Sequence, residues 1–304
     1  MTAHLVITPG ITQDCSPCPL ERSIISALEG LLGTTGIALR GGGHRFEAIE
    51  AAQESQTIEV VRLAQEFRFD WAWIAHGQQL RDFRVLAMDM DSTIINIECL
   101  DELADFCGQK AAVAAITGAA MRGEIADYAE SLRQRGALLK GLSITAVDRV
   151  IQERLRFNPG AADLISAAAA AGLRTLLVSG GFSLFTDHVS RSLGIHEVCS
   201  NRLEVESGRL TGRLMEPIVD GQAKKAAVLG LCERLGCDAS AAIAVGDGAN
   251  DLPMMAVAGL SVAYRAKPAV AAVASRAIEY GGLDSLLLGW NEPVDPAVNE
   301  EMLA

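Results

Sequence analysis

Short, continuous apolar runs separated by alanine-rich stretches characterise the chain from Arg84 onward. Four such runs occupy residues 85–88, 176–178, 243–245 and 261–263. A strand that is covered on both faces is apolar at every position, so each run predicts a buried strand. Alanine-rich stretches such as 161–171 predict helices between them. Strands that alternate with helices predict an α/β fold with a parallel sheet and right-handed crossovers.

The first eighty residues follow a different pattern. An apolar run at 5–7 predicts a short strand, and apolar residues between 24 and 32 recur at helical spacing. Three glycines at 41–43 form a break, and a second helix is predicted around 57–67. Aromatic residues at 67, 69, 71 and 73 alternate with other residues, as in a half-buried strand. We therefore expect a small α/β domain at 1–80 and a larger domain at 81–304.

The overall charge restricts the classes of partner. Lys and Arg number 26 against 38 Asp and Glu, so the net charge is −12, and no basic tract occurs. Nucleic acids and anionic membrane surfaces require clustered positive charge, so neither is an expected partner. The longest uncharged stretches, 1–13 and 252–264, are too short for a membrane helix. The first of them also lacks the basic segment of a signal peptide.

The seven cysteines are scattered, and only Cys15 and Cys18 lie close together. No second Cys or His pair has the spacing of a zinc site, so we expect free thiols and a reducing cytoplasm. A redox or metal role for the Cys15–Cys18 pair is the less favoured alternative.

Polar and acidic groups follow three of the four predicted strands. In a parallel sheet, ligands bind beyond the carboxyl ends of the strands, so these groups are candidate site residues. Asp89 and Asp91 follow the first run, and their i, i+2 spacing places both carboxylates on one face. Together with Asp247 and Asp251 they would suit a hard divalent cation such as Mg²⁺. An isolated Asp-x-Asp would more often only cap a turn.

The remaining strand-end groups suit an anion. Ser179 and Gly180 follow the second run, where a hydroxyl and bare amides at a helix start would hold a phosphate. A glycine pair by itself indicates only a tight turn. Either Lys224 or Lys225 would neutralise phosphate charge if it lay near the acidic cluster, although surface lysines are the more ordinary interpretation of this pair.

These motifs resemble those of phosphatases of the haloacid dehalogenase superfamily. Residues 89–103, 131–139, 178–182 and 245–254 are similar to the phosphoserine phosphatase family in particular, as is the hairpin-like segment 201–212. Their sequences are DMDSTIINIECLDEL, SLRQRGALL, VSGGF and VGDGANDLPM. The resemblance covers about residues 84–290. It implies a Rossmann-like parallel-sheet core with an inserted helical cap at about 97–157.

The resemblance also implies a role for each motif residue. Asp89 would be the nucleophile that becomes an aspartyl-phosphate, and Asp91 the general acid and base. Mg²⁺ would be held by Asp89, by the backbone carbonyl of Asp91 and by Asp247, with Asp251 orienting its waters. The phosphoryl group would contact Ser179, Gly180, Lys224 and Asn250.

The cap would select the substrate. Glu98, nine residues after Asp89, corresponds to the group that meets the ammonium of phosphoserine, and Arg135 to the group that meets its carboxylate. Tyr128 is expected at the aromatic side of the pocket. Considered singly, Glu98 and Arg135 would be solvated helix charges. Gly136 departs from the larger aliphatic residue that is frequent in the family.

The expected activity is therefore Mg²⁺-dependent hydrolysis of O-phospho-L-serine, the last step of serine biosynthesis. A phosphatase or phosphotransferase acting on another small phosphate, such as phosphohomoserine, is the alternative within the enzymes. A non-catalytic module that accepts phosphate on Asp89 is the alternative outside them. The N-terminal pattern resembles a degraded ACT-like domain, for which homodimer contact or simple packing is favoured over ligand binding.

Overall fold

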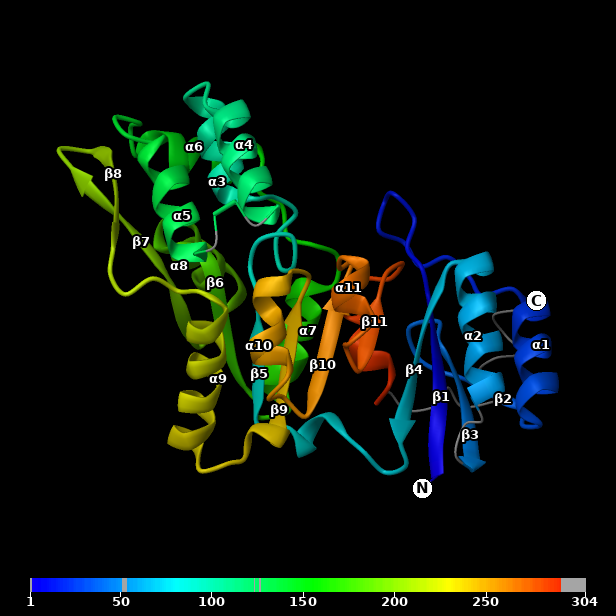
Figure 1. Ribbon diagram of the computed structural model, residues 1–304. Helices are drawn as coiled ribbons and strands as arrows, with labels where there is room; N and C mark the ends of the chain where they lie inside the picture. Colours follow the sequence, from blue (N-terminus) through cyan, green and yellow to red (C-terminus); the bar gives the residue numbers. More distant parts are fainter. Residues whose placement is uncertain (1, 51–53, 123, 126, 291–304) are drawn as a thin grey trace.

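The computed structural model describes residues 2–50, 54–122, 124–125 and 127–290, and within these residues the chain forms two sheets (Figure 1). The first is a small antiparallel sheet whose strand order is β2-β3-β1-β4. Its elements follow one another in the order strand, helix, two strands, helix, strand. They are β1 (Thr2–Pro9), α1 (Arg22–Leu32), β2 (Gly36–Ala38), β3 (His44–Glu50), α2 (Glu54–Phe67) and β4 (Phe69–Ala75).

The small α/β domain that the sequence predicts is thus present, with two differences. Strands β2 and β3 were not predicted, because β2 has only three residues and β3 mixes charged residues with apolar ones. Phe67 ends α2 instead of beginning a strand, since Arg68 has a positive φ of 56° and separates the helix from β4. An ACT-like relationship stays a prediction.

The second sheet carries the four predicted buried strands. Its order among the described residues is β11-β10-β9-β5-β6-β7-β8, parallel except for the hairpin between β7 and β8. The apolar runs lie within β5, β6, β9 and β10, so these predictions are confirmed. The strands are β5 (Val85–Met88), β6 (Arg174–Phe182), β7 (Glu197–Glu206), β8 (Arg209–Met215), β9 (Ala242–Gly246), β10 (Leu260–Tyr264) and β11 (Arg276–Ile278).

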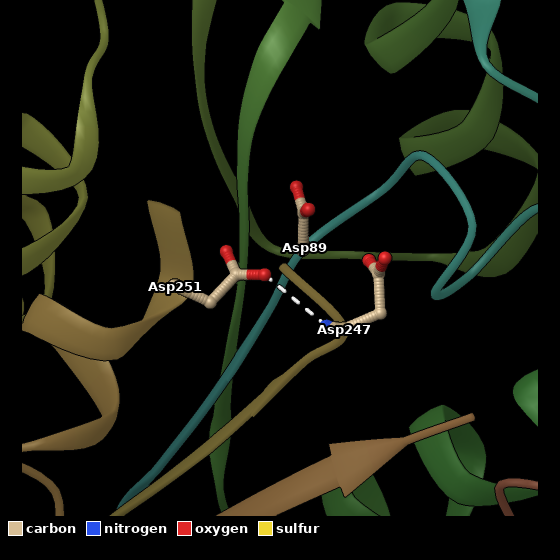
Figure 2. A group of neighbouring side chains, drawn as sticks. All are labelled: Asp89, Asp247 and Asp251. Atoms are coloured by element: carbon tan, nitrogen blue, oxygen red, sulfur yellow. Dashed lines mark hydrogen bonds between the residues drawn. The ribbon is translucent and has the colours of Figure 1, made fainter. Parts of the chain in front are cut away.

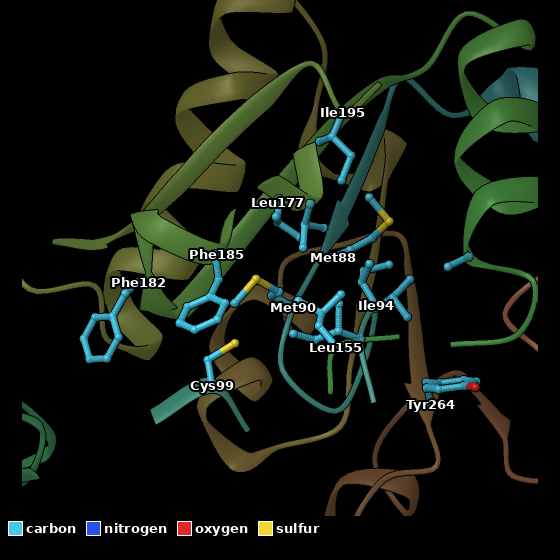
Figure 3. Close-up of a cluster of buried hydrophobic side chains, with 14 of the residues drawn as sticks. Met88, Met90, Ile94, Cys99, Leu155, Leu177, Phe182, Phe185, Ile195 and Tyr264 are labelled. Atoms are coloured by element: carbon cyan, nitrogen blue, oxygen red, sulfur yellow. The ribbon is translucent and has the colours of Figure 1, made fainter. Parts of the chain in front are cut away.

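Alternate residues of β5 face opposite layers of helices. Leu86 and Met88 join the core beneath α7, α8 and α12, part of which Figure 3 shows. Val85 and Ala87 join the core beneath α9, α10 and α11. Because both faces are covered, every position of β5 is buried. The helices are α7 (Ala161–Ala170), α8 (Ser183–Leu193), α9 (Gly221–Leu235), α10 (Leu252–Met255), α11 (Pro268–Ala271) and α12 (Ser285–Leu288), with 3-10 turns η1 (Leu80–Asp82), η2 (Ala239–Ala241) and η3 (Ala249–Asp251).

Four helices between β5 and β6 form a helical insertion, which lies beside the β7–β8 hairpin at one end of the sheet (Figure 1). They are α3 (Cys99–Phe106), α4 (Lys110–Met121), α5 (Tyr128–Ala137) and α6 (Thr145–Glu153). Leu100 and Leu103 of α3 are buried. Asp127 caps α5 by accepting a hydrogen bond from the Ala129 N–H at 3.0 Å, so this helix begins at Tyr128. No helix in the described part of the chain has the length and apolar character needed to cross a membrane.

Candidate active site

The loop after β5 presents Asp89 and Asp91. The backbone N–H of Asp89 donates to the Val245 carbonyl at 2.9 Å, so Asp89 extends the pairing of β5 with β9. Asp89 is buried, with 6% of its surface exposed, and Asp91 is half-buried. Oδ1 of Asp91 is buried and has no hydrogen-bond partner among the described residues. The Asn158 side chain anchors the loop by donating to the carbonyls of Thr93 and Ile95.

Lys224 lies directly behind Asp89. It belongs to the first turn of α9, whose N-terminus is capped by Asp220 through the Ala223 N–H at 2.8 Å. Its ammonium Nζ is 2.7 Å from Oδ1 of Asp89 and 2.7 Å from Oδ1 of Asp251, and the side chain is fully buried. Of the two lysines that the sequence left open, Lys224 is therefore the one in the acidic cluster.

The turn after β9 brings two further carboxylates to the same place. Asp247 accepts a hydrogen bond from the Thr93 hydroxyl at 3.1 Å, and Oδ2 of Asp251 accepts from the backbone N–H of Asp247 and Gly248. Figure 2 shows the carboxylates of Asp89, Asp247 and Asp251 gathered around one point. One oxygen from each lies within 4.8 Å of the others.

Burial and mutual repulsion raise the pKa values of three carboxyl groups at this site. The pKa of Asp89 is raised by burial and by Asp251, against the opposing effect of Lys224. Burial and Glu98 raise the pKa of Asp91 to about 7, and burial and Asp251 raise that of Asp247 to about 6. Burial alone would lower the pKa of Lys224, but Asp89 and Asp251 outweigh it and raise that pKa.

The donor set suits a magnesium ion. Three carboxylates against one ammonium leave the cluster with an excess of two negative charges when all are ionised. A divalent cation would balance that excess, and carboxylate oxygens are the ligands that Mg²⁺ prefers. Both oxygens of Asp251 are already engaged by Lys224 and backbone N–H groups. Asp89 and Asp247 are accordingly the better direct ligands of the three.

The predicted phosphate cradle lies at the end of β6. Ser179 is buried, and its hydroxyl accepts a hydrogen bond from the Gly181 N–H at 2.9 Å. A Cβ at Gly180 would lie 2.4 Å from the Tyr128 hydroxyl oxygen, so glycine leaves room there for this hydroxyl group. This close approach brings α5 of the helical insertion against the cradle.

A cavity of about 170 Å³ joins the strand ends to the helical insertion. Most of the expected site residues line it: Asp89, Asp91, Glu98, Tyr128, Arg135, Ser179, Gly180, Asp247 and Asn250. Lys224 and Asp251, which were also expected, do not line the cavity but contact residues that do. Lys224 forms an ion pair with Asp89, and Asp251 accepts a hydrogen bond from the backbone N–H of Asp247. The structure therefore brings all the expected residues together around one small polar space.

Some lining residues were not predicted as site residues. Lys267 lies after β10, and its backbone N–H donates to the Asp247 carbonyl at 3.3 Å. Lys267 is one of the polar residues that follow the fourth apolar run, and its position after a strand could have indicated it as a site residue. Leu132 and Phe182 supply apolar wall and were hidden among core-like positions. Thr93 was noted only as part of its motif, although it orients Asp247.

Comparisons with known proteins agree with this geometry. The sequence pattern of the haloacid dehalogenase-like hydrolases matches residues 86–256, which is more than half of the chain. The chain therefore belongs to the haloacid dehalogenase-like hydrolase family. The phosphoserine phosphatase of a Polaromonas species (strain JS666) is 59% identical over 213 residues, covering 69% of this chain and 90% of that protein. The expected resemblance, and the expectation of an enzyme, are confirmed.

Two solved structures extend the similarity to the N-terminal domain. A haloacid dehalogenase-family hydrolase from Salmonella enterica serovar Typhi has a TM-score of 0.83 at 27% identity, covering 96% of this chain and 98% of its own. A probable phosphoserine phosphatase from Vibrio cholerae has a TM-score of 0.78 at 30% identity, and the match covers 95% of this chain and 86% of that one. The small domain and the catalytic sheet thus occur together in related proteins.

Proposed function

We propose that the protein hydrolyses O-phospho-L-serine to L-serine and phosphate, with Mg²⁺ as cofactor and an aspartyl-phosphate on Asp89 as intermediate. In the cell this reaction would be the last step of serine biosynthesis. The observation that carries the proposal is one cavity lined by Asp89 and Asp91 at its base and by Glu98 and Arg135 from the helical insertion. The similarity to curated phosphoserine phosphatases supports it.

Asp89 is arranged as a nucleophile. The Met90 N–H and Lys224 both bind its Oδ1, whereas Oδ2 accepts no hydrogen bond among the described residues and is the oxygen for attack. As Oδ2 bonds to phosphorus, the ester P–O bond breaks and the serine oxygen leaves. A Mg²⁺ held by Asp89, Asp247 and the Asp91 backbone carbonyl would stabilise negative charge on the phosphoryl oxygens.

Asp91 supplies and removes the proton. Its pKa of about 7 allows the carboxylic acid to protonate the leaving serine oxygen near neutral pH. The resulting carboxylate then takes a proton from the water that attacks phosphorus, which breaks the bond to Oδ2 and regenerates Asp89. The same side chain thus serves both halves of the reaction.

Glu98 and Arg135 account for the choice of an amino-acid substrate. Arg135 has no carboxylate partner within ion-pair distance in the described part of the chain, so its guanidinium can hold the carboxylate of a ligand bidentately. Glu98 holds the Ser92 hydroxyl at 2.7 Å, and its second oxygen can accept from an ammonium group. Ser179, Gly180 and Asn250 would contact the phosphoryl group at the other end.

Removing the nucleophile tests the mechanism. In Asp89→Asn, release of phosphate from phosphoserine should fall to background, because an amide cannot form the acyl phosphate. The measurement is phosphate release with Mg²⁺ and after chelation of Mg²⁺, which should also abolish turnover. Asp187→Asn, the same chemical change at an exposed site on α8, is the control. Unchanged turnover in Asp89→Asn would refute the mechanism.

A panel of phosphoserine, phosphohomoserine and phenyl phosphate tests the choice of substrate. Phosphohomoserine carries the same ammonium and carboxylate groups as phosphoserine, so kcat/KM for these two esters, which should be higher for phosphoserine, separates them. Arg135→Ala should raise KM for phosphoserine far more than for phenyl phosphate, which has no carboxylate. Arg133→Ala is the matched control, since Arg133 lies on the same helix but pairs with Glu216 at 2.8 Å. An equal effect of Arg135→Ala on both substrates would contradict the assignment.

The domain organisation completes the proposal. We place the boundary between the N-terminal domain and the catalytic domain near residue 80, and a substrate cap at about 97–157. Residues 291–304 of the expected catalytic range lie outside the described residues. All seven cysteines are free, which supports a reducing compartment such as the cytoplasm.

A further inference from the structure

The pairing of β6 with β7 is interrupted beside the phosphate cradle. Ser179 lies opposite Ser200, but Asn201, the next residue of β7, lies opposite Phe182. Gly180 and Gly181 therefore have no partner residue on β7. A bulge of this kind re-aims the local backbone and leaves peptide groups that must find other partners.

The side chain of Asn201 supplies the missing partner. It is fully buried, and its amide nitrogen Nδ2 donates to the Gly180 carbonyl at 2.8 Å. The same nitrogen donates to the Val219 carbonyl at 3.4 Å, and Oδ1 accepts from the Val219 N–H at 2.7 Å. The orientation of the amide is determined by the backbone, since an N–H must face the oxygen and two carbonyls must face the nitrogen.

These bonds connect two parts of the candidate active site that are distant in sequence. Gly180 belongs to the cradle at the end of β6. Val219 immediately precedes Asp220, the residue that caps α9 and so determines where the first turn, with Lys224, begins. One buried side chain thus fixes the distance between the phosphate cradle and the helix that carries the ammonium group.

We propose that Asn201 is a positioning residue for phosphoryl binding, which holds the Ser179–Gly180 cradle and the Lys224 helix in register. The inference rests on the proposed function, because it takes the cradle to be the phosphoryl site. Asn201 touches neither the cavity nor the reacting atoms, so it acts through Gly180 and α9. Asparagine is required because aspartate offers no donor to the two carbonyls, and a serine hydroxyl, which has one proton, can donate to only one of them.

Loss of a buried hydrogen-bonding residue also destabilises a fold, so the test needs a control for stability. Thr175 provides one on β6, the strand that carries the cradle. It is fully buried and pairs with Nδ1 of His196 at 2.7 Å, at the opposite end of β6 from the cradle. The same hydroxyl also accepts from the His196 backbone N–H at 3.1 Å, so Thr175→Val removes both hydrogen bonds of a buried hydroxyl on β6 without touching the site.

The experiment compares full-length Asn201→Asp, Asn201→Ser and Thr175→Val with the unaltered protein in saturating Mg²⁺. Thermal unfolding gives the loss of stability, and kinetics give kcat/KM for phosphoserine and inhibition by inorganic phosphate and by L-serine. A displaced cradle should cost roughly 10–100-fold in kcat/KM for Asn201→Asp, and less for Asn201→Ser. Inhibition by phosphate should weaken in parallel, while inhibition by L-serine, which contacts Glu98 and Arg135, should not change.

Kinetic constants for the Asn201 variants that match those of Thr175→Val would overturn the proposal, whatever the loss of stability. If Asn201→Asp does not fold, Asn201→Ser decides on the same criteria. If the unaltered protein does not hydrolyse phosphoserine, the proposed function fails, and calorimetric binding of inorganic phosphate still tests Asn201. Equal phosphate affinity in the unaltered protein and in the Asn201 variants would then refute the inference.

Discussion

The carboxylates of the cluster differ in their neighbours. Burial and the nearby Asp251 raise the pKa of Asp247, whereas Asp251 itself accepts hydrogen bonds from Lys224 and two backbone N–H groups. Asp247 is therefore the carboxylate of the three that has no ion-pair partner among the described residues. This imbalance makes its protonation and the binding of a cation competing events.

Binding of Mg²⁺ should consequently weaken in acid. The pKa of Asp247 in the metal-free protein is raised to about 6, so the protonated form dominates below that pH and a proton must be displaced for the ion to bind. From pH 7 to pH 5 the affinity should fall by up to about tenfold per pH unit for each proton displaced. Calorimetric titration of Mg²⁺ without phosphate, at several pH values, measures this slope.

Asp247→Asn is the control for that titration. It should bind Mg²⁺ weakly and lose the part of the slope that Asp247 contributes. A Mg²⁺ affinity of the unaltered protein that is constant between pH 5 and pH 7 would contradict the prediction.

The chemistry of individual residues was predictable where it followed from position after a strand. Asp89, Ser179 and Asp247 each come directly after or within the end of an apolar run, so sequence alone indicated that they meet. Asn201 was not predictable in this way. Its role depends on a register shift between β6 and β7, and a bulge leaves no mark in the hydrophobic pattern.

At the scale of elements, the position of α5 determines where Arg135 and Tyr128 enter the cavity. A Cβ at Gly136 would lie 2.6 Å from Cδ1 of Leu214 on β8. The glycine therefore lets the helix approach the hairpin closely, and it explains the departure from the larger residue that is frequent in the family. Sequence analysis noted the departure but could not explain it, because the contact joins segments far apart in the chain.

Gly136→Val should force α5 away from the hairpin. Overpacking of this kind costs about 1–3 kcal/mol of stability. Because Arg135 is adjacent, KM for phosphoserine should rise while KM for phenyl phosphate changes little. Urea unfolding and steady-state kinetics measure the two effects.

Two further variants make the test of α5 specific. Leu214→Ala added to Gly136→Val should restore much of the loss, since it makes space for the new side chain. Gly30→Val, at an exposed position of helix α1 where a new Cβ would have nothing within 4 Å, isolates the effect of the residue on helix formation. Equal losses in Gly136→Val and Gly30→Val, with no recovery in the double variant, would show that the contact with Leu214 is unimportant.

At the scale of the whole molecule, the net negative charge would repel an anionic substrate, so the local charges of the site matter more than the total. The chain carries a net charge of −12, yet its expected substrate is an anion. Arg135 and Lys267 line the cavity and Lys224 lies behind it, but four carboxylates line it as well. A positive field for the phosphate and carboxylate would therefore require bound Mg²⁺ in addition to these cations. Net charge disfavours polyanionic partners but contains no information about such a local field.

The contact between the two sheets is a second feature that sequence analysis missed. Asp70, on β4 of the N-terminal domain, is buried and accepts hydrogen bonds from the backbone N–H groups of Glu279, Tyr280 and Gly281 after β11. Arg68 also lies over the Tyr280 ring. The acceptors and donors are about 210 positions apart, so no local pattern could predict them. A buried, multiply bonded carboxylate is therefore part of the contact that joins the two domains, beside an apolar cluster in which Ile74 packs against Trp290.

Asp70→Asn should weaken this docking and leave catalysis intact. An amide keeps one acceptor oxygen but turns an NH₂ group toward backbone donors, so roughly 1.5–3 kcal/mol of stability should be lost. Urea unfolding should show the loss, and the transitions of the two domains should separate as their coupling weakens. Because Asp70 does not line the cavity, kcat and KM in the absence of urea should match those of Asp187→Asn, the exposed control. A single cooperative transition at the midpoint of the unaltered protein would mean that apolar packing, and not this carboxylate, holds the N-terminal domain on the catalytic one.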